Sequence, residues 1–115
     1  MNNHMDSMDE YEKGTVCYNL EDYDNAKNFL EKAKSGNKKD DAEIMLMLGK
    51  TYEQLGDSNY AASIYSQYLE NVGDHPAIYN QLGLCKLKSE DYEAALRAFQ
   101  SGLAIEEKND YIQQL

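Results

Sequence analysis

A pattern of small residues that recurs at a fixed interval constrains this chain more than any other feature. Gly14, Gly49 and Gly83 lie 35 and 34 residues apart. An alanine follows each glycine 12 residues later, at positions Ala26, Ala61 and Ala95. A period of this length is typical of arrays in which one two-helix unit is copied and stacked. Such an array offers an extended surface for holding another molecule, whereas catalysis requires one unusual cluster of polar groups.

The apolar residues around each glycine have the spacing of a helix. In the second copy they stand at i, i+3, i+7 and i+10, as Met45, Leu48, Tyr52 and Leu55. Gly56 and Asp57 interrupt the pattern, and a second helix is expected to end near Gly73. The connection is short, so the two helices should be antiparallel. The small residues are expected to let the two helices approach closely.

The third copy follows the same plan and is the clearest of the three. Its second helix is expected to present an apolar face made of Ala95, Leu96, Phe99 and Leu103. Four tyrosines fall at core positions of the repeat and are interpreted as packing residues, namely Tyr52, Tyr65, Tyr79 and Tyr92.

Polar residues at fixed places predict where helices begin. An aspartate stands eight residues after each glycine, as Asp22, Asp57 and Asp91. Its carboxylate is expected to cap the second helix of each copy by accepting unpaired backbone N–H groups. Pro76 fits the first turn of a helix that Asp74 or His75 caps, and Ser7 with Glu10 has the spacing of a capping box.

Composition agrees with this interpretation and excludes several kinds of partner. One proline, seven glycines and no tryptophan favour helices, so the predicted fold class is all-α. With 11 basic and 21 acidic residues the formal net charge is −10, which disfavours nucleic acid and anionic lipid surfaces. No stretch approaches the roughly 20 apolar residues of a membrane span, so no membrane insertion is expected.

The cysteines and histidines do not indicate a disulfide, a metal site or a catalytic site. Cys17 and Cys85 lie two copies apart, too far for a disulfide, and two free thiols suit a reducing compartment, so the expected location is cytoplasmic. His4 and His75 have no Cys or carboxylate at metal spacing, so neither a metal nor a cofactor is expected. No nucleophile with a base and no phosphate-binding glycine loop is visible, and we expect no enzyme activity.

At this point the residues resemble a known family. Leu82 and Gly83 with Tyr92, Ala95 and Phe99 have the spacing L-G-x8-Y-x2-A-x3-F, which resembles the 34-residue tetratricopeptide repeat. The resemblance implies a right-handed α-α superhelix, or solenoid, of antiparallel helix hairpins. The predicted division is a disordered tail over 1–6, three repeats over 7–41, 42–75 and 76–109, and the start of a further, truncated helix over 110–115.

The resemblance also implies a concave groove, lined by the first helix of each hairpin, that receives a peptide or helix of a partner protein. Carried across by register, the groove residues are Tyr11, Thr15, Tyr18, Asn19, Leu46, Lys50, Glu53, Gln54, Asn80, Leu84, Leu87 and Lys88, with Met8, Glu43 and Ala77 at further positions. Their apolar and amide side chains suit peptide binding. The alternative for the leucines is packing against neighbouring helices.

The expected function is a non-catalytic scaffold that binds a protein or peptide, neutral or basic rather than acidic because of the chain's charge. The alternative is a structural or self-associating unit of a larger multi-repeat protein. In that alternative, a homodimer would form through an exposed apolar face of the C-terminal repeat, with Leu103, Ile105, Tyr111 and Ile112.

Replacing Ala61 or Ala95 by leucine should overpack the hairpin and lower the free energy of unfolding by roughly 1–3 kcal/mol. Thermal or denaturant unfolding of the two variants measures this. An unchanged melting temperature in both would contradict the alignment of the repeats.

Some members of the family grip the terminal carboxylate of a chaperone tail with basic side chains. The equivalent positions here are held by Tyr11, Thr15, Met47, Ala77 and Gln81, none of which is basic. A carboxylate buried there would have no charged partner, so we expect no binding of such a peptide. Titration with an acidic chaperone-tail peptide tests this, and low-micromolar affinity would overturn it.

Overall fold

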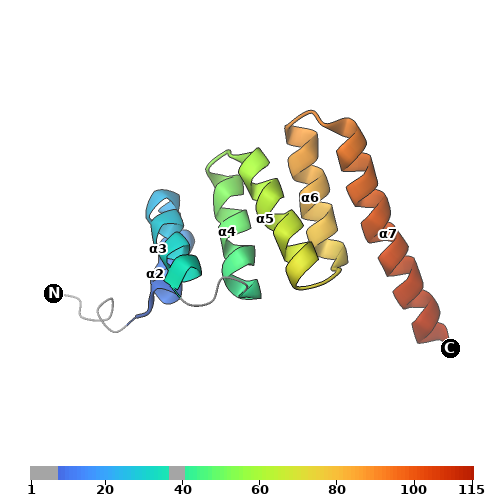
Figure 1. Cartoon of the computed structure of the whole chain (residues 1–115), viewed down its shortest axis with the longest axis horizontal. Coiled ribbons are helices and arrows are strands. Elements are labelled where there is room, and N and C mark those ends of the chain that lie inside the picture. Colours follow the sequence, from blue (N-terminus) through green and yellow to red (C-terminus); the bar gives the residue numbers. More distant parts are fainter. Residues whose placement is uncertain (1–7, 37–40) are drawn as a thin grey trace.

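The computed structural model describes residues 8–36 and 41–115, and in this part of the chain it contains helices and no strand. The helices form three antiparallel hairpins, which are α2 (Glu10–Asn19) with α3 (Tyr23–Gly36), α4 (Ala42–Gln54) with α5 (Ser58–Asn71), and α6 (Pro76–Lys88) with α7 (Tyr92–Gln114) (Figure 1). The all-α prediction is confirmed. The tail predicted over 1–6 lies outside the described residues.

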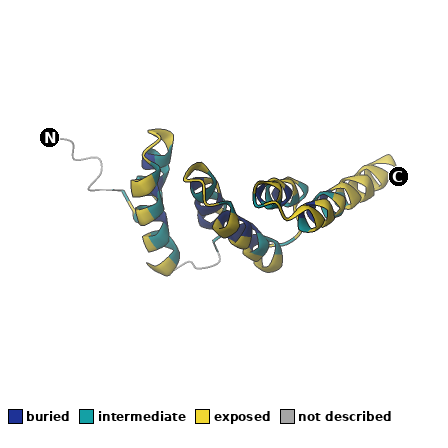
Figure 2. Cartoon of the chain, turned by 90° about the horizontal axis from the view of Figure 1, so that it is seen from above, coloured by how far each residue is buried: buried dark blue, intermediate teal, exposed yellow. Residues whose placement is uncertain are grey.

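The hairpins stack in a row and form an α-α superhelix. Within each hairpin the two helices pack together, and α3 packs on α4 and α5 on α6 to join one hairpin to the next. The resulting body is elongated, with extents of 55 × 36 × 23 Å, and Figure 2 shows the buried residues along the interfaces between helices. A continuous apolar core runs from the first hairpin to α6, and its fully buried side chains include Leu30, Met45, Leu48, Ile64 and Tyr65.

The repeated glycines make room for side chains from the second helix of each hairpin. A methyl group built on Gly49 would lie 2.5 Å from Cε1 of Tyr65, closer than any packed structure allows. Gly14 has the same relation to Leu30, and Gly83 to Phe99. The close approach expected of the small residues is seen in the first hairpin, where a methyl group on Gly14 would also lie 3.4 Å from the carbonyl oxygen of Ala26. The three alanines are buried, and each glycine is covered by a large side chain four residues after the alanine, which was not predicted from the sequence.

The turns inside the three hairpins have the same hydrogen bonds. In the first turn, the Asp22 N–H donates to the carbonyl of Cys17 at 2.8 Å, which closes α2. The Asp22 carboxylate accepts from the N–H of Asn25 at 3.4 Å, which caps α3. Asp57 and Asp91 do the same for the second and third hairpins. The predicted capping role of the three aspartates is confirmed.

The residue before each aspartate has a left-handed backbone. It is glycine in the second hairpin, where Gly56 has φ of 84°. Glu21 and Glu90 occupy the same place in the other two hairpins, each with φ of 62°. Glycine adopts this conformation without steric cost, while a residue with a Cβ does not. The two glutamates therefore hold a conformation that the turn, and not their own preference, imposes.

The capping box predicted at the start of α2 is wrong in position. Asp9, not Ser7, is the N-cap residue: its carboxylate accepts from the N–H of Glu12 at 2.8 Å, and the Glu12 carboxylate accepts from the N–H of Asp9 at 3.0 Å. The box therefore lies two residues later, and Ser7 lies outside the described residues. At α6 the prediction holds, because His75 Nδ1 accepts from the N–H of Ala77 at 3.2 Å and Pro76 begins the helix.

The C-terminal helix differs from the prediction. Residues 110–114 continue α7, so the separate helix expected over 110–115 is not formed. Neither glycine nor proline occurs after Gly102, and nothing in the sequence ends the helix there. Tyr92, expected in the core, and Leu96, expected on the apolar face of this helix, are 63% and 57% exposed, because among the described helices α6 is the one that packs against α7 and it leaves this side uncovered. Figure 2 shows that most of α7 is exposed.

Gly49→Ala should lower the free energy of unfolding, because the added methyl group meets the ring of Tyr65, which is fully buried. Overpacking costs roughly 1–3 kcal/mol, and the better helix propensity of alanine offsets about 1 kcal/mol of it. The net loss should therefore be up to about 2 kcal/mol by denaturant unfolding.

Gly36→Ala is the matched control, because a methyl group there meets nothing within 4 Å. It should leave stability unchanged or raise it by up to about 1 kcal/mol. Equal effects of the two substitutions would show that contact with Tyr65 is not the reason for glycine at position 49.

Candidate protein-interaction site

The twelve predicted groove residues lie on α2, α4 and α6, the first helices of the three hairpins, and we call this set the helix A surface. None of the twelve is buried. Tyr11, Thr15, Tyr18, Leu46 and Glu53 are partly buried, and the exposed members are Asn19, Lys50, Gln54, Asn80, Leu84, Leu87 and Lys88. The side chains that the register placed together are therefore open to solvent in whole or in part.

The apolar members of the helix A surface fall into two groups. Leu46 packs against the core, as in the alternative reading of the leucines. Leu84 and Leu87 on α6 are instead 39% and 41% exposed. Side chains of this size gain free energy when another apolar surface covers them. The third hairpin thus leaves two leucines of the helix A surface open to solvent.

The polar members of the helix A surface differ in whether their side chains form hydrogen bonds within the protein. The Thr15 hydroxyl donates to the carbonyl of Tyr11 at 3.0 Å, one turn back on the same helix. Asn19, Gln54 and Asn80 are exposed, and their side chains make no hydrogen bond with the described residues. Amide side chains both donate and accept, so these three are suited to a partner's backbone.

Glu53 belongs to a hydrogen-bond network that joins three helices. Its Oε2 accepts from the hydroxyl of Tyr65 on α5 and from Nε2 of Gln81 on α6, the latter at 3.1 Å. Burial, together with the Glu53 carboxylate, raises the pKa of the Tyr65 hydroxyl well above its ordinary value and keeps it a donor. Tyr65 was predicted as a packing residue only. Its hydroxyl was a signal that could have been used, because a buried tyrosine usually finds a hydrogen-bond partner.

A similar bond joins the first hairpin to the second. The hydroxyl of Tyr52 on α4 donates to the Glu31 carboxylate on α3 at 2.6 Å. Burial and this hydrogen bond raise the pKa of the Tyr52 hydroxyl. Each junction between hairpins thus has a side-chain hydrogen bond to a glutamate, from Tyr52 to Glu31 at the first and from Gln81 to Glu53 at the second. Of the two glutamates, only Glu53 belongs to the helix A surface.

Both cysteines are buried and free, as predicted. Burial is the main cause that raises the pKa of Cys85 to about 11, and burial also raises the pKa of Cys17. A thiol with a raised pKa stays protonated at neutral pH and is a poor nucleophile. The two side chains act as small packing residues.

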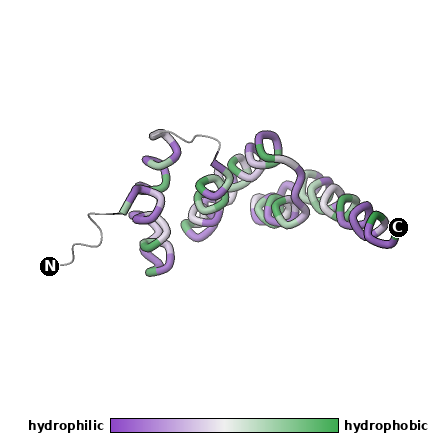
Figure 3. Tube along the Cα trace, turned by 90° about the horizontal axis from the view of Figure 1, so that it is seen from below, coloured by the Kyte–Doolittle hydropathy of each residue, from purple (hydrophilic) through white to green (hydrophobic). Residues whose placement is uncertain are grey.

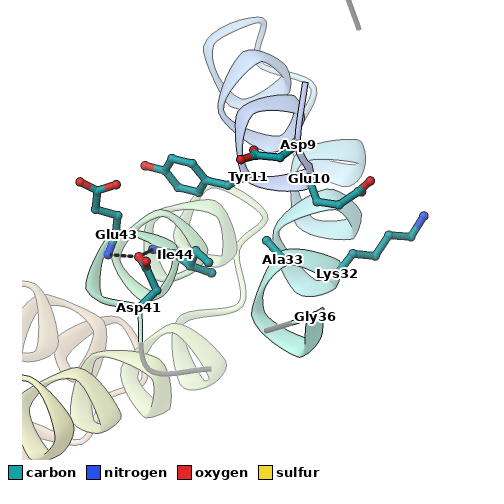
Figure 4. A pocket seen from close by; sticks show the side chains of 9 residues that line it. All are labelled: Asp9, Glu10, Tyr11, Lys32, Ala33, Gly36, Asp41, Glu43 and Ile44. Atoms are coloured by element: carbon teal, nitrogen blue, oxygen red, sulfur yellow. Dashed lines mark hydrogen bonds between the residues drawn. The ribbon is translucent and has the colours of Figure 1, made fainter. Parts of the chain in front are cut away.

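A cavity of about 440 Å³ lies beside the N-terminal part of the helix A surface. The ends of α2, α3 and α4 enclose it, and its lining comprises Asp9, Glu10, Tyr11, Lys32, Ala33, Gly36, Asp41, Glu43 and Ile44 (Figure 4). Two of its carboxylates are already used by the fold, because Asp9 caps α2 and Asp41 caps α4. The sequence did not predict this cavity, since it depends on how three helix ends meet.

Other kinds of site were also considered. Among the described residues, no group of three His, Cys, Asp or Glu side chains is placed to hold a metal ion. None of the described helices has the length and apolar character needed to cross a membrane.

Comparison with known proteins identifies a family that matches the chain and a solved structure with a similar fold. Two family profiles described as tetratricopeptide repeat match the chain, one over residues 11–39 and 76–109 and the other over 43–75. No curated protein sequence matches. Among solved structures, one described as the crystal structure of MamA is similar, with a TM-score of 0.81 and 22% identity. The similarity covers 89% of this chain and 59% of the MamA chain, and at this identity it shows the fold alone.

Proposed function

The chain belongs to the tetratricopeptide repeat family, and from this premise we propose that its helix A surface binds a peptide or a helix of a partner protein. Repeats of this family generally mediate protein–protein interaction and are typically non-catalytic. The observation that carries the proposal is the exposure of Leu84 and Leu87 beside amide side chains on the first helices of the hairpins. Apolar anchors next to groups that can pair with a backbone are what peptide recognition requires.

The charge of the chain supports a neutral or basic partner. A net charge of −10 repels acidic segments and speeds the approach of basic ones, and salt weakens both effects. The two buried thiols suit a reducing environment, and a cytoplasmic location stays a prediction.

Self-association through α7 is a second candidate function, and one observation favours it. Ala62 is buried and Leu69 partly buried on α5, the helix that packs against α6. Their equivalents one repeat later are Leu96 and Leu103, each 57% exposed on α7. Figure 3 shows that apolar residues recur along α7 toward its C-terminal end. In this second candidate, a copy of the chain would cover that face.

One pair of substitutions separates the two candidates. A random 12-residue peptide library is selected on the wild-type protein, and the affinity of the enriched peptides is measured on Leu84→Glu and Leu103→Glu. Both replace an exposed leucine by a charge, on α6 and α7 respectively. We expect Leu84→Glu to weaken binding by at least about tenfold, as loss of an apolar anchor does, and Leu103→Glu to have little effect.

Solution mass of the wild-type protein and both variants completes the test. A dimer that only Leu103→Glu dissociates would favour self-association through α7. Failure to enrich any peptide, or equal binding by wild type and Leu84→Glu, would remove the helix A surface as the binding site.

A further inference from the structure

We propose that Glu53 selects the partner by offering a fixed carboxylate to a lysine or arginine side chain of the bound segment. This rests on the proposed function, since it names the chemistry that the helix A surface recognises. It goes beyond the general preference expected from net charge, because it assigns the preference to one carboxylate at a defined place.

The carboxylate of Glu53 is held in place before any partner binds. Its Oε2 accepts from both the Tyr65 hydroxyl and Gln81 Nε2, which come from two different helices. The ring of Tyr65 is fully buried under Gly49, so the donor hydroxyl has little freedom to move. A side chain oriented by such bonds loses less conformational entropy when it binds a ligand.

The second oxygen of the same carboxylate is available. Oε1 accepts no hydrogen bond from the described residues, and it is not among their buried polar atoms that lack a partner. It is therefore not sealed inside the core, although the buried Cys85 thiol lies close enough to this carboxylate for Glu53 to help raise the thiol's pKa. A donor from another molecule can reach this oxygen without displacing the bonds that hold Glu53.

The charge of Glu53 is not neutralised by the fold. Across the described part of the chain, no Lys or Arg lies within ion-pair distance of it. Lys50 stands one turn earlier on α4 but forms no ion pair with Glu53. The neutral donors Tyr65 and Gln81 leave the negative charge in place. A hydrogen bond from a cation to an ionised carboxylate is roughly twice as strong as one between neutral groups, so a basic side chain is the favoured ligand.

The surroundings of Glu53 suit the rest of a basic residue. Leu84 lies one turn after Gln81 on α6, and it is exposed. The aliphatic stem of a lysine or arginine can pack on such a leucine while the charged group reaches the carboxylate. Gln54 and Asn80, both exposed, are placed on the same two helices to pair with the backbone. The favoured partner is therefore a segment with a basic residue next to an apolar one.

The chain contains its own control for this inference. Glu31 makes the same kind of hydrogen bond with a tyrosine, Tyr52, but it lies on α3 and outside the helix A surface. Glu31→Gln removes one negative charge and keeps an acceptor for the hydroxyl, as Glu53→Gln does. The two variants thus change net charge alike and each keep an acceptor for a tyrosine hydroxyl, and they differ in position and in the additional bond from Gln81 to Glu53.

The test uses peptides selected from the random 12-residue library on the wild-type protein. We expect these peptides to be enriched in Lys or Arg, and Glu53→Gln to weaken their binding by about tenfold or more. Glu31→Gln should change it less than twofold. Replacing the basic residue of the peptide by norleucine should weaken binding to wild type and leave binding to Glu53→Gln unchanged, which isolates the pair.

The peptide substitution keeps the test decisive if Glu53→Gln is poorly folded, because it is measured on the intact wild-type protein. Peptides without a basic preference, or equal losses in Glu53→Gln and Glu31→Gln, would overturn the assignment to Glu53 while leaving a peptide-binding surface. If no peptide is enriched, or Leu84→Glu has no effect, the proposed function itself fails.

Discussion

The contact between a large side chain and a glycine in each hairpin determines the rest of this structure. Leu30 covers Gly14, Tyr65 covers Gly49 and Phe99 covers Gly83. A Cβ at any of the three glycines would overlap the covering side chain, so the helices pack at the observed distance only because it is missing. Hairpins of the same shape can then stack on one another, through α3 on α4 and α5 on α6.

The central hairpin uses this contact for more than packing. Because the covering residue is a tyrosine, its hydroxyl reaches the far side of the core and bonds to Glu53, which also accepts from Gln81 of the next hairpin. Leucine in the first hairpin and phenylalanine in the third have no group that could do so. The same side chain that spaces two helices thus also orients a carboxylate on the surface proposed to bind a partner.

Much of the fold follows from local patterns in the sequence. The features that could not be predicted depend on contacts between helices. The glycine and alanine period and the aspartate caps predicted the hairpins, because spacing and capping are local. The exposure of Tyr92 and the continuation of α7 were missed, because they depend on what lies next to the helix. The bond between Tyr65 and Glu53 was missed since nothing local relates two residues that meet only after α4 and α5 pack. The twelve residues of the helix A surface were predicted only by carrying the groove positions of the family across in the register of the repeats.

The aspartate that follows the first helix of each hairpin makes two hydrogen bonds, one with its backbone N–H and one with its carboxylate. Its N–H closes the helix before it and its carboxylate opens the helix after it, as at Asp22, Asp57 and Asp91. If the aspartate moves out of the turn, both hydrogen bonds break, and the helix ends on both sides of the turn are freed at once. Each hairpin should accordingly open and close as one unit, so that amide protons near its turn exchange together and the smallest independently fluctuating segment is a pair of helices.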